Sequence, residues 1–103
     1  MTQNKSFTLP HPKTLKDKTL VNKTTILNIG DIIVETDRFG RDFTYYKIVG
    51  EENGWYKYLR LYDPKYPLPK IVNADKETTH MTHLFYLTYK VNGVIQTLYG
   101  ANT

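Results

Sequence analysis

The segment of residues 54–63, with the sequence GWYKYLRLYD, combines aromatic and basic side chains that could bind another molecule. Side chains alternate between the two faces of a β-strand, so the odd and even positions of this segment separate. The odd positions include two leucines, so we expect them to face the core with Trp55, while Lys57 reaches solvent along its aliphatic stem. The even positions, which we expect to be exposed, are Tyr56, Tyr58, Arg60 and Tyr62.

The exposed face of this segment predicts a binding surface. Aromatic rings that stack on bases, beside cations that contact phosphate, are typical of nucleic-acid sites. Tyrosine and arginine are also enriched where proteins bind one another, because they bring a large contact area with a polar end. A third interpretation is structural: the three tyrosines pack beneath another segment and only stabilise the fold.

The excess positive charge lies near the beginning of the chain. The formal net charge is +4, and residues 1–25 hold five lysines against one aspartate, so this leader accounts for the whole excess. A basic arm attracts nucleic acid or an acidic protein surface. The cations that we expect to contact a partner are Lys13, Lys16, Lys18, Arg38, Arg41, Lys57 and Arg60. The alternative is that the leader is a partly disordered, soluble segment.

Other residues that could do chemistry are expected to be structural. His80 and His83 are spaced like metal ligands on a helix, but they fall in a segment predicted as strand, where positions three apart face opposite sides. Asp31, Glu35 and Asp37 could form a cation-binding or acid/base cluster, but the two aspartates lie in predicted turns, where a carboxylate bonds nearby backbone. The only serine lies in the leader. We therefore expect a non-enzymatic protein without a metal or cofactor.

The segments that would position these residues are strands. β-Branched and aromatic residues cluster in short runs separated by turn residues, and no helix of normal length stands out. Residues 30–37, 43–50 and 55–62 predict an antiparallel meander, with reversals at 38–42 and 51–54.

The rest of the chain predicts a short strand and a hairpin. Residues 70–73 can form the strand, after a proline-rich loop over 63–70. Asn92-Gly93 lies between two β-rich runs and predicts a two-residue type I′ turn, in which both positions have positive φ. The cross-strand pairs expected on one side are Val91 with Val94, Tyr89 with Gln96, and Leu87 with Leu98. This side, with Phe85, is expected to face the core.

Together these elements predict one all-β domain. Short strands without helices to cover them must curl to bury one face. We predict a small SH3-like barrel of five to six antiparallel strands over residues 26–103, preceded by a flexible basic leader over residues 1–25. The length of 103 residues suits a single domain.

Three segments of this pattern resemble small uncharacterised proteins of bacteriophages and mobile elements. They are GDIIVETDRFGRDFTYYKIVG, YLRLYD and YKVNGVIQTLYG, within roughly residues 29–100. The opening GD strand also resembles the KOW module, an SH3-like unit associated with nucleic acid, from which this chain differs by lacking the later glycines. The resemblance implies an SH3-like barrel and a phage or mobile-element origin.

Two functions fit these observations. The first is a small nucleic-acid-binding protein, which we prefer narrowly because of the lysine-rich leader. The second, which the resemblance favours, is an accessory protein that binds and modulates a host protein through the tyrosine face or an exposed sheet edge. The chain has no cysteine, which fits the reducing cytoplasm, and no apolar run approaches the length of a membrane span. We therefore expect a cytoplasmic protein without a membrane partner.

Overall fold

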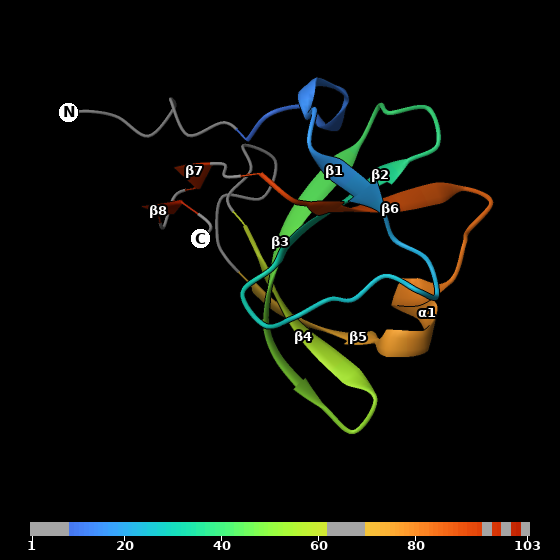
Figure 1. The fold of residues 1–103 in the computed structure, drawn as a ribbon, viewed down its shortest axis with the longest axis vertical. Helices are drawn as coiled ribbons and strands as arrows, with labels where there is room; N and C mark the ends of the chain where they lie inside the picture. Colours follow the sequence, from blue (N-terminus) through green and yellow to red (C-terminus); the bar gives the residue numbers. More distant parts are fainter. Residues whose placement is uncertain (1–8, 62–69, 94–95, 98–99, 102–103) are drawn as a thin grey trace.

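The computed structural model describes residues 9–61, 70–93, 96–97 and 100–101 of the chain. Six antiparallel strands form one sheet in the order β1-β6-β2-β3-β4-β5, so the predicted all-β fold is confirmed (Figure 1). The strands are β1 (Lys18–Leu20), β2 (Ile32–Asp37), β3 (Phe43–Glu52), β4 (Trp55–Arg60), β5 (Lys70–Asp75) and β6 (Tyr86–Val91). A separate pair joins β7 (Gln96–Thr97) to β8 (Gly100–Ala101), and the helical turns are η2 (Pro12–Thr14) and α1 (Lys76–His80).

The central meander forms as the sequence predicts. β2 pairs with β3 and β3 with β4, and β5 extends the sheet beside β4, which confirms the strand predicted at 70–73. Asn53 and Gly54 have φ values of 50° and 85°, as in a type I′ turn, so they close the β3–β4 hairpin tightly. β1 and β5 are the edges of the sheet, so hydrogen bonding between the described strands does not close it into a barrel. Within these ranges, no helix is long and apolar enough to cross a membrane.

Both faces of the sheet are buried. A first core cluster contains Leu9, Ile32, Val34, Tyr45, Leu61 and Val91. A second core cluster contains Val21, Leu27, Ile33, Ile48, Tyr56 and Tyr58. Neighbouring residues of β2 enter different clusters because side chains alternate, so the clusters lie on opposite faces of the sheet. This arrangement explains why β2 begins with an unbroken apolar run.

The N-terminal segment covers parts of both faces. Leu9 belongs to the first core cluster, whereas Val21 and Leu27 belong to the second. Between them, β1 pairs with β6, placing Lys18 opposite Val91. The described part of the predicted leader, residues 9–25, therefore contributes a strand to the sheet and side chains to both core clusters. The physical reason is that a sheet with two apolar faces needs cover on each of them.

The predicted faces of β4 are also wrong. Tyr56 and Tyr58 retain only 4% and 5% of their exposure, whereas Trp55 is 48% exposed. Leu61 is buried as predicted, but it lies in the first core cluster, on the other face from the two tyrosines. Burial of the leucine face therefore does not leave the tyrosine face exposed. Both faces of this segment are covered, each along a different stretch of it.

The hairpin predicted at Asn92-Gly93 does not form. β6 pairs along one edge with β1 and along the other with β2, so it has no free edge for a returning strand. Asn92 does not adopt positive φ; instead its backbone N–H donates to the Asp17 carbonyl at 2.9 Å. Phe85, expected in the core, precedes β6 and is 76% exposed. The predicted pairing residues Val94 and Leu98 lie outside the described residues, as do Tyr62 and residues 63–69 of the proline-rich loop.

Candidate nucleic-acid interface

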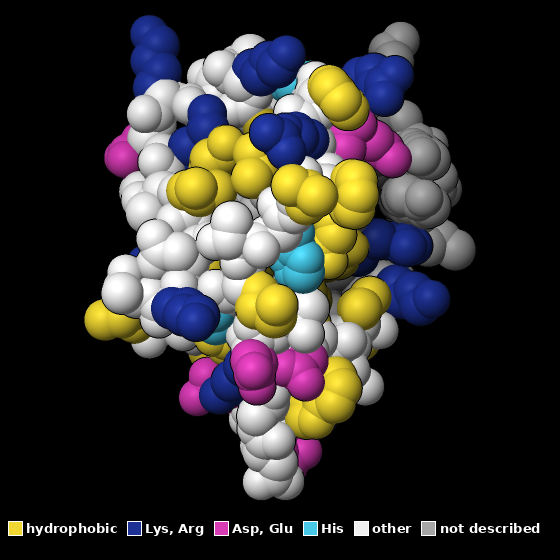
Figure 2. Space-filling view, turned by 90° about the vertical axis from the view of Figure 1, so that its right-hand side faces the viewer, with side chains coloured by type: hydrophobic (Ala, Val, Ile, Leu, Met, Phe, Trp, Pro, Cys, Tyr) yellow, Lys and Arg dark blue, Asp and Glu magenta, His cyan; other side chains and the backbone are white. Residues whose placement is uncertain are grey.

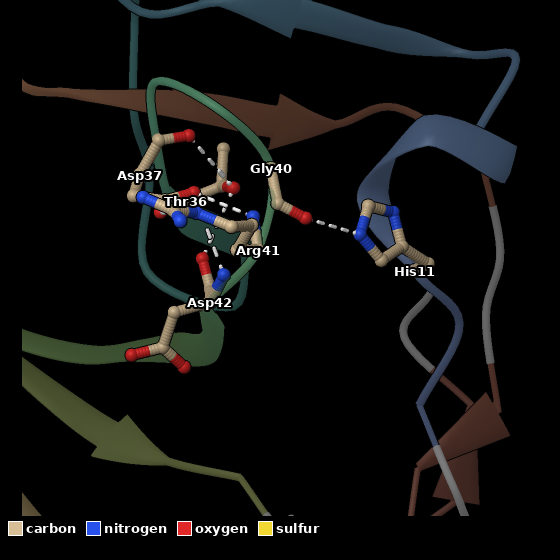
Figure 3. A network of polar contacts seen from close by, with 6 residues as sticks. All are labelled: His11, Thr36, Asp37, Gly40, Arg41 and Asp42. Carbon is tan, nitrogen blue, oxygen red and sulfur yellow. Dashed lines mark hydrogen bonds and ion pairs between the residues drawn. The ribbon is translucent and has the colours of Figure 1, made fainter.

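The turn between β2 and β3 is fixed by the side chain of Asp37. Its carboxylate accepts hydrogen bonds from the backbone N–H of Arg41 at 2.7 Å and from that of Asp42 at 3.4 Å (Figure 3). Gly40 has a φ of 73°, which permits the tight reversal. The Thr36 hydroxyl donates to the Asp42 carbonyl at 3.1 Å. The predicted structural role of Asp37 is confirmed, and the turn that carries the two arginines is rigidly held.

The Asp37 carboxyl is held in its ionised form. Partial burial acts to raise its pKa, but the backbone N–H groups of Arg41, Asp42 and Gly40 and the charge of Arg41 together lower it. The Arg41 Nε lies 3.8 Å from Asp37 Oδ2, while the Arg41 side chain remains 79% exposed. The guanidinium group is therefore near its counterion and still accessible to a ligand.

The N-terminal segment braces this turn from outside. His11 Nε2 lies 2.6 Å from the Gly40 carbonyl oxygen, and His11 Nδ1 accepts a hydrogen bond from the Lys13 N–H at 3.1 Å. A carbonyl only accepts, so this pattern requires the hydrogen on Nε2. A Cβ added at Gly40 would lie 2.8 Å from Lys13 Cε, so the aliphatic chain of Lys13 lies directly on the glycine. Lys13 is thereby brought beside the turn of Arg38 and Arg41.

Exposed phenylalanines lie among these cations. Phe39, in the turn itself, is 69% exposed, and the Arg41 guanidinium carbon lies 5.2 Å from its ring centroid. The backbone N–H of Arg38 donates to the Phe85 carbonyl at 2.9 Å, and Arg38 Nη1 donates to the Leu84 carbonyl at 3.2 Å. These bonds join the turn to the loop that precedes β6. A second exposed aromatic side chain, Phe85, therefore belongs to a segment fixed beside the first.

We call this region the turn surface and define it as Lys13, Arg38, Phe39, Arg41, Leu84 and Phe85. Figure 2 shows the side of the molecule that carries the β2–β3 turn and the loop before β6. Basic and hydrophobic side chains adjoin one another over the upper half of that view. The sequence pointed to the cations of this surface, but not to its phenylalanines. The available signal was Phe39 itself, a large apolar residue between two arginines in a segment predicted as a turn.

The tyrosines predicted to stack on bases are not accessible. The Tyr56 hydroxyl donates to His80 Nε2 at 2.6 Å, because His80 Nδ1 is directed to the Asn22 carbonyl, and the Tyr58 hydroxyl lies 2.7 Å from Thr79 Oγ1. Burial is the largest effect on both phenols and raises the pKa of each. The prediction of two exposed tyrosines is therefore wrong, and their structural interpretation is confirmed. They face the side of the sheet that the N-terminal segment and α1 cover.

The remaining predicted site residues are dispersed. Lys18 is used internally, since its Nζ donates to two backbone carbonyls, each at 2.9 Å, and lies 5.2 Å from the Tyr89 ring centroid. Lys16 is exposed before β1, and Lys57 is exposed on β4. Arg60 is half-buried opposite Tyr46 on β3. The structure therefore brings Lys13, Arg38 and Arg41 together and separates them from the residues of β4.

The histidines are held by hydrogen bonds. His80 ends α1 and bonds Tyr56 and Asn22, and His83 Nε2 lies 3.1 Å from the Thr78 carbonyl. The strand predicted for this segment is wrong, because the Asp75 side chain caps a short helix by accepting from the Thr78 N–H at 3.2 Å. Among the described residues, no three histidine or carboxylate side chains are grouped so that they could hold a metal ion.

The carboxylates of the β2 region do not form a cluster. Asp31 precedes β2 and Asp37 ends it, so about 20 Å of extended chain separates them. Asp31 Oδ2 instead accepts from the Asn28 N–H at 2.7 Å, which is the turn role predicted for it. Burial raises the pKa of Glu35, and the charge of His83 opposes this effect less strongly. Each of the three carboxyl groups therefore has a separate environment.

Comparison with known proteins found no matching protein family, no matching curated protein and no matching solved structure. The resemblance to phage and mobile-element proteins therefore stays a prediction, and the turn surface is interpreted from its own geometry.

Proposed function

We propose that this protein is a non-enzymatic module that binds single-stranded nucleic acid through the turn surface. The supporting observation is that Phe39, 69% exposed, lies in the turn that carries Arg38 and Arg41. Phe85, 76% exposed, lies in the loop whose carbonyl groups accept hydrogen bonds from Arg38. Exposed aromatic rings offer stacking surfaces to bases, and neighbouring guanidinium groups contact phosphates or stack on the same bases. Single strands fit best, since only unpaired bases are free to stack on protein side chains.

Charge supports this proposal. Lys13 places a third cation beside the two arginines, and Lys16 lies exposed only a few residues away in the sequence. If Lys13, Arg38 and Arg41 each contact one phosphate, the logarithm of the affinity should fall with the logarithm of the salt concentration with a slope of about −2. The nucleic-acid hypothesis is thus retained with phenylalanines in place of the buried tyrosines.

The test is fluorescence anisotropy with labelled oligothymidylate and oligouridylate, with a DNA duplex for comparison, across a salt series. We expect salt-dependent binding to the single strands and a loss of about tenfold or more for the Phe39→Ala/Phe85→Ala double variant, because stacking is worth about 1–3 kcal/mol per base. Trp55→Ala is the matched control, since it removes an exposed aromatic ring elsewhere in the sheet. Equal binding by wild type and the double variant, or no binding at low salt, would refute the proposal.

A second candidate function is docking on a host protein by a phage or mobile-element accessory protein. The observation that favours it is the exposure of Leu84 (66%) and Met81 (46%), since aliphatic side chains bury well against proteins but do not stack on bases. The same double variant distinguishes the two functions. If it loses a lysate partner that resists nuclease treatment, while the wild type binds no oligonucleotide, docking is the correct function.

We also propose that the six-stranded sheet is an SH3-like barrel and that the protein acts in the cytoplasm. The first is supported by a single sheet of six antiparallel strands, the number and arrangement that the barrel requires. The second is supported by the lack of cysteine in the chain.

A further inference from the structure

A second candidate site lies on the β3–β4 hairpin, at the other end of the molecule from the β2–β3 turn (Figure 1). It is an open hollow of about 530 Å³ lined by Glu52, Asn53, Trp55, Lys57 and Asn73. None of the cations of the turn surface lines it. The hollow is therefore independent of the proposed nucleic-acid interface.

Strand register builds this hollow from neighbouring positions. The tight turn at Asn53 and Gly54 places Glu52 opposite Trp55, and the pairing of β4 with β5 places Lys57 opposite Asn73. Paired residues project from the same face, so these side chains surround one area of the sheet.

Gly50 has no side chain, so the surface of the sheet is depressed at this position. It lies opposite Lys57 at a register shift in β3, where a β-bulge inserts one extra residue. A Cβ at Gly50 would lie 3.5 Å from both Cβ and Cδ of Lys57, so the lysine stem passes over bare backbone there. This stem and the Trp55 side chain supply the apolar part of the lining.

The polar side chains around Trp55 are uncommitted. Within the described part of the chain, no hydrogen bond or ion pair engages the side chains of Glu52, Asn53, Lys57 or Asn73. Two amides, one carboxylate and one ammonium group are therefore free to donate and accept. Trp55 is 48% exposed beside them, although tryptophan is usually well buried.

We propose that this hollow binds a neutral saccharide. One face of a pyranose ring carries several C–H groups and packs against an indole ring, whose face is electron-rich. The hydroxyl groups around the sugar both donate and accept hydrogen bonds. The amide side chains can also donate and accept, and the carboxylate can accept. The volume of about 530 Å³ lies within the range of about 300–1,000 Å³ found for small-molecule sites, and is sufficient for one or two sugar units.

Charge favours a neutral ligand over a polyanion. Acidic residues outnumber basic ones around the hairpin, where Glu51, Glu52 and Asp75 accompany Lys57 and Lys76. Lys76 is already engaged, since its Nζ lies 3.3 Å from Glu51 Oε2. A phosphate backbone would therefore be repelled by the net negative charge here, whereas a neutral sugar would not be repelled.

Trp55 provides its own assay because it is the only tryptophan in the chain. Its fluorescence should be titrated with maltose, cellobiose, lactose and N,N′-diacetylchitobiose. We expect a saturable change with at least one of these disaccharides. Asn73→Ala should weaken that binding about threefold to tenfold, as the loss of one hydrogen bond does. Trp55→Ala should abolish disaccharide binding, which calorimetry measures because this variant has no tryptophan fluorescence.

Phe39→Ala, at the turn surface, is the matched control and should bind the disaccharide as the wild type does. Asn73 is exposed on an edge strand, so its substitution should leave the fold intact, and Glu52→Gln provides a second variant of the same lining. The proposal is overturned if none of these disaccharides changes the Trp55 emission saturably. It is equally overturned if both lining variants bind with wild-type affinity, or if dextran sulfate binds at Trp55 more tightly than every neutral sugar.

Discussion

Tyr58→Ala should unfold much of the protein, whereas Tyr58→Phe should destabilise it only moderately. Tyr58 is 5% exposed and its ring centroid lies 5.1 Å from that of Tyr46 and 5.9 Å from that of Tyr56. Truncating a large buried aromatic residue to alanine costs about 3–5 kcal/mol in the free energy of unfolding. Because a domain of this size is stable by only about 5–15 kcal/mol, this loss is a large part of the total.

The phenylalanine variant isolates the hydroxyl group. It removes the 2.7 Å hydrogen bond to Thr79 and leaves the packing of the ring in place. The expected cost is about 1 kcal/mol, which lowers the melting temperature by about 4–8 °C for a domain of this size. Burial raises the pKa of Tyr58, so the phenol stays protonated at neutral pH and the cost should not vary there.

Circular dichroism during thermal and urea unfolding measures both variants, and oligonucleotide anisotropy measures binding by Tyr58→Phe. Trp55→Ala is the matched control on the same strand and should lower the free energy of unfolding by less than Tyr58→Ala does, because this side chain is 48% exposed. The reasoning is refuted if Tyr58→Ala keeps wild-type stability and loses nucleic-acid binding. That result would mean that the even positions of β4 form the binding face.

Further variants test the other inferred roles. Burial raises the pKa of Glu35 above its unfolded value, so stability present below the unfolded pKa is lost as pH rises through the folded pKa. Glu35→Gln should therefore stabilise the protein at pH 7, and urea unfolding should show this gain shrinking as pH falls toward about 4.5. Gly40→Ala strains a φ of 73° and drives a methyl group to 2.8 Å from Lys13 Cε, so calorimetry should show a loss of about 1–2 kcal/mol, with weaker oligonucleotide binding. Lys18→Met removes bonds to two backbone carbonyls and should cost about 1–3 kcal/mol in urea unfolding while leaving the salt slope of binding unchanged.

The strands from β2 to β6 could be predicted from the sequence, but β1 and the buried faces of the sheet could not. Runs such as Ile32-Ile33-Val34 have a local preference for extended structure that survives in the fold. The assignment of faces in β4 assumed that burial of one face implies exposure of the other. That inference holds for a sheet covered on one side and fails here, because residues far away in the sequence cover the second side. No local pattern within β4 contains that information.

The two Asn-Gly pairs of the chain show the same limit in turn formation. At Asn53-Gly54 both residues have positive φ and the strands on either side pair, as the dipeptide favours. At Asn92-Gly93 the preceding strand already has a partner on each edge. Turn preference selects a conformation only where the following strand has an edge to pair with, and the occupancy of an edge is decided by the tertiary fold.

The candidate site was predictable residue by residue but not as an arrangement. Arg38 and Arg41 could be identified because they flank a turn glycine, and Lys13 because it belongs to a basic segment. Their convergence depends on the bond between His11 and the Gly40 carbonyl, a contact between positions 29 residues apart. The exposure of Phe85 was also hidden, because the sequence places it beside a strand that is otherwise half-buried.

The N-terminal segment contains both core residues and basic residues. The contribution of its charge to binding must therefore be tested without removing its core residues. Deleting residues 1–23 would remove the basic side chains, but it would also remove Leu9 and Val21 from the two core clusters and β1 from the edge of the sheet. A loss of binding by the truncated protein could therefore result from unfolding as well as from the loss of positive charge. Substituting exposed Lys13 and Lys16 by glutamine removes charge from the same segment while retaining its apolar cover. Only the substitution separates attraction to phosphate from the integrity of the sheet on which the turn surface is built.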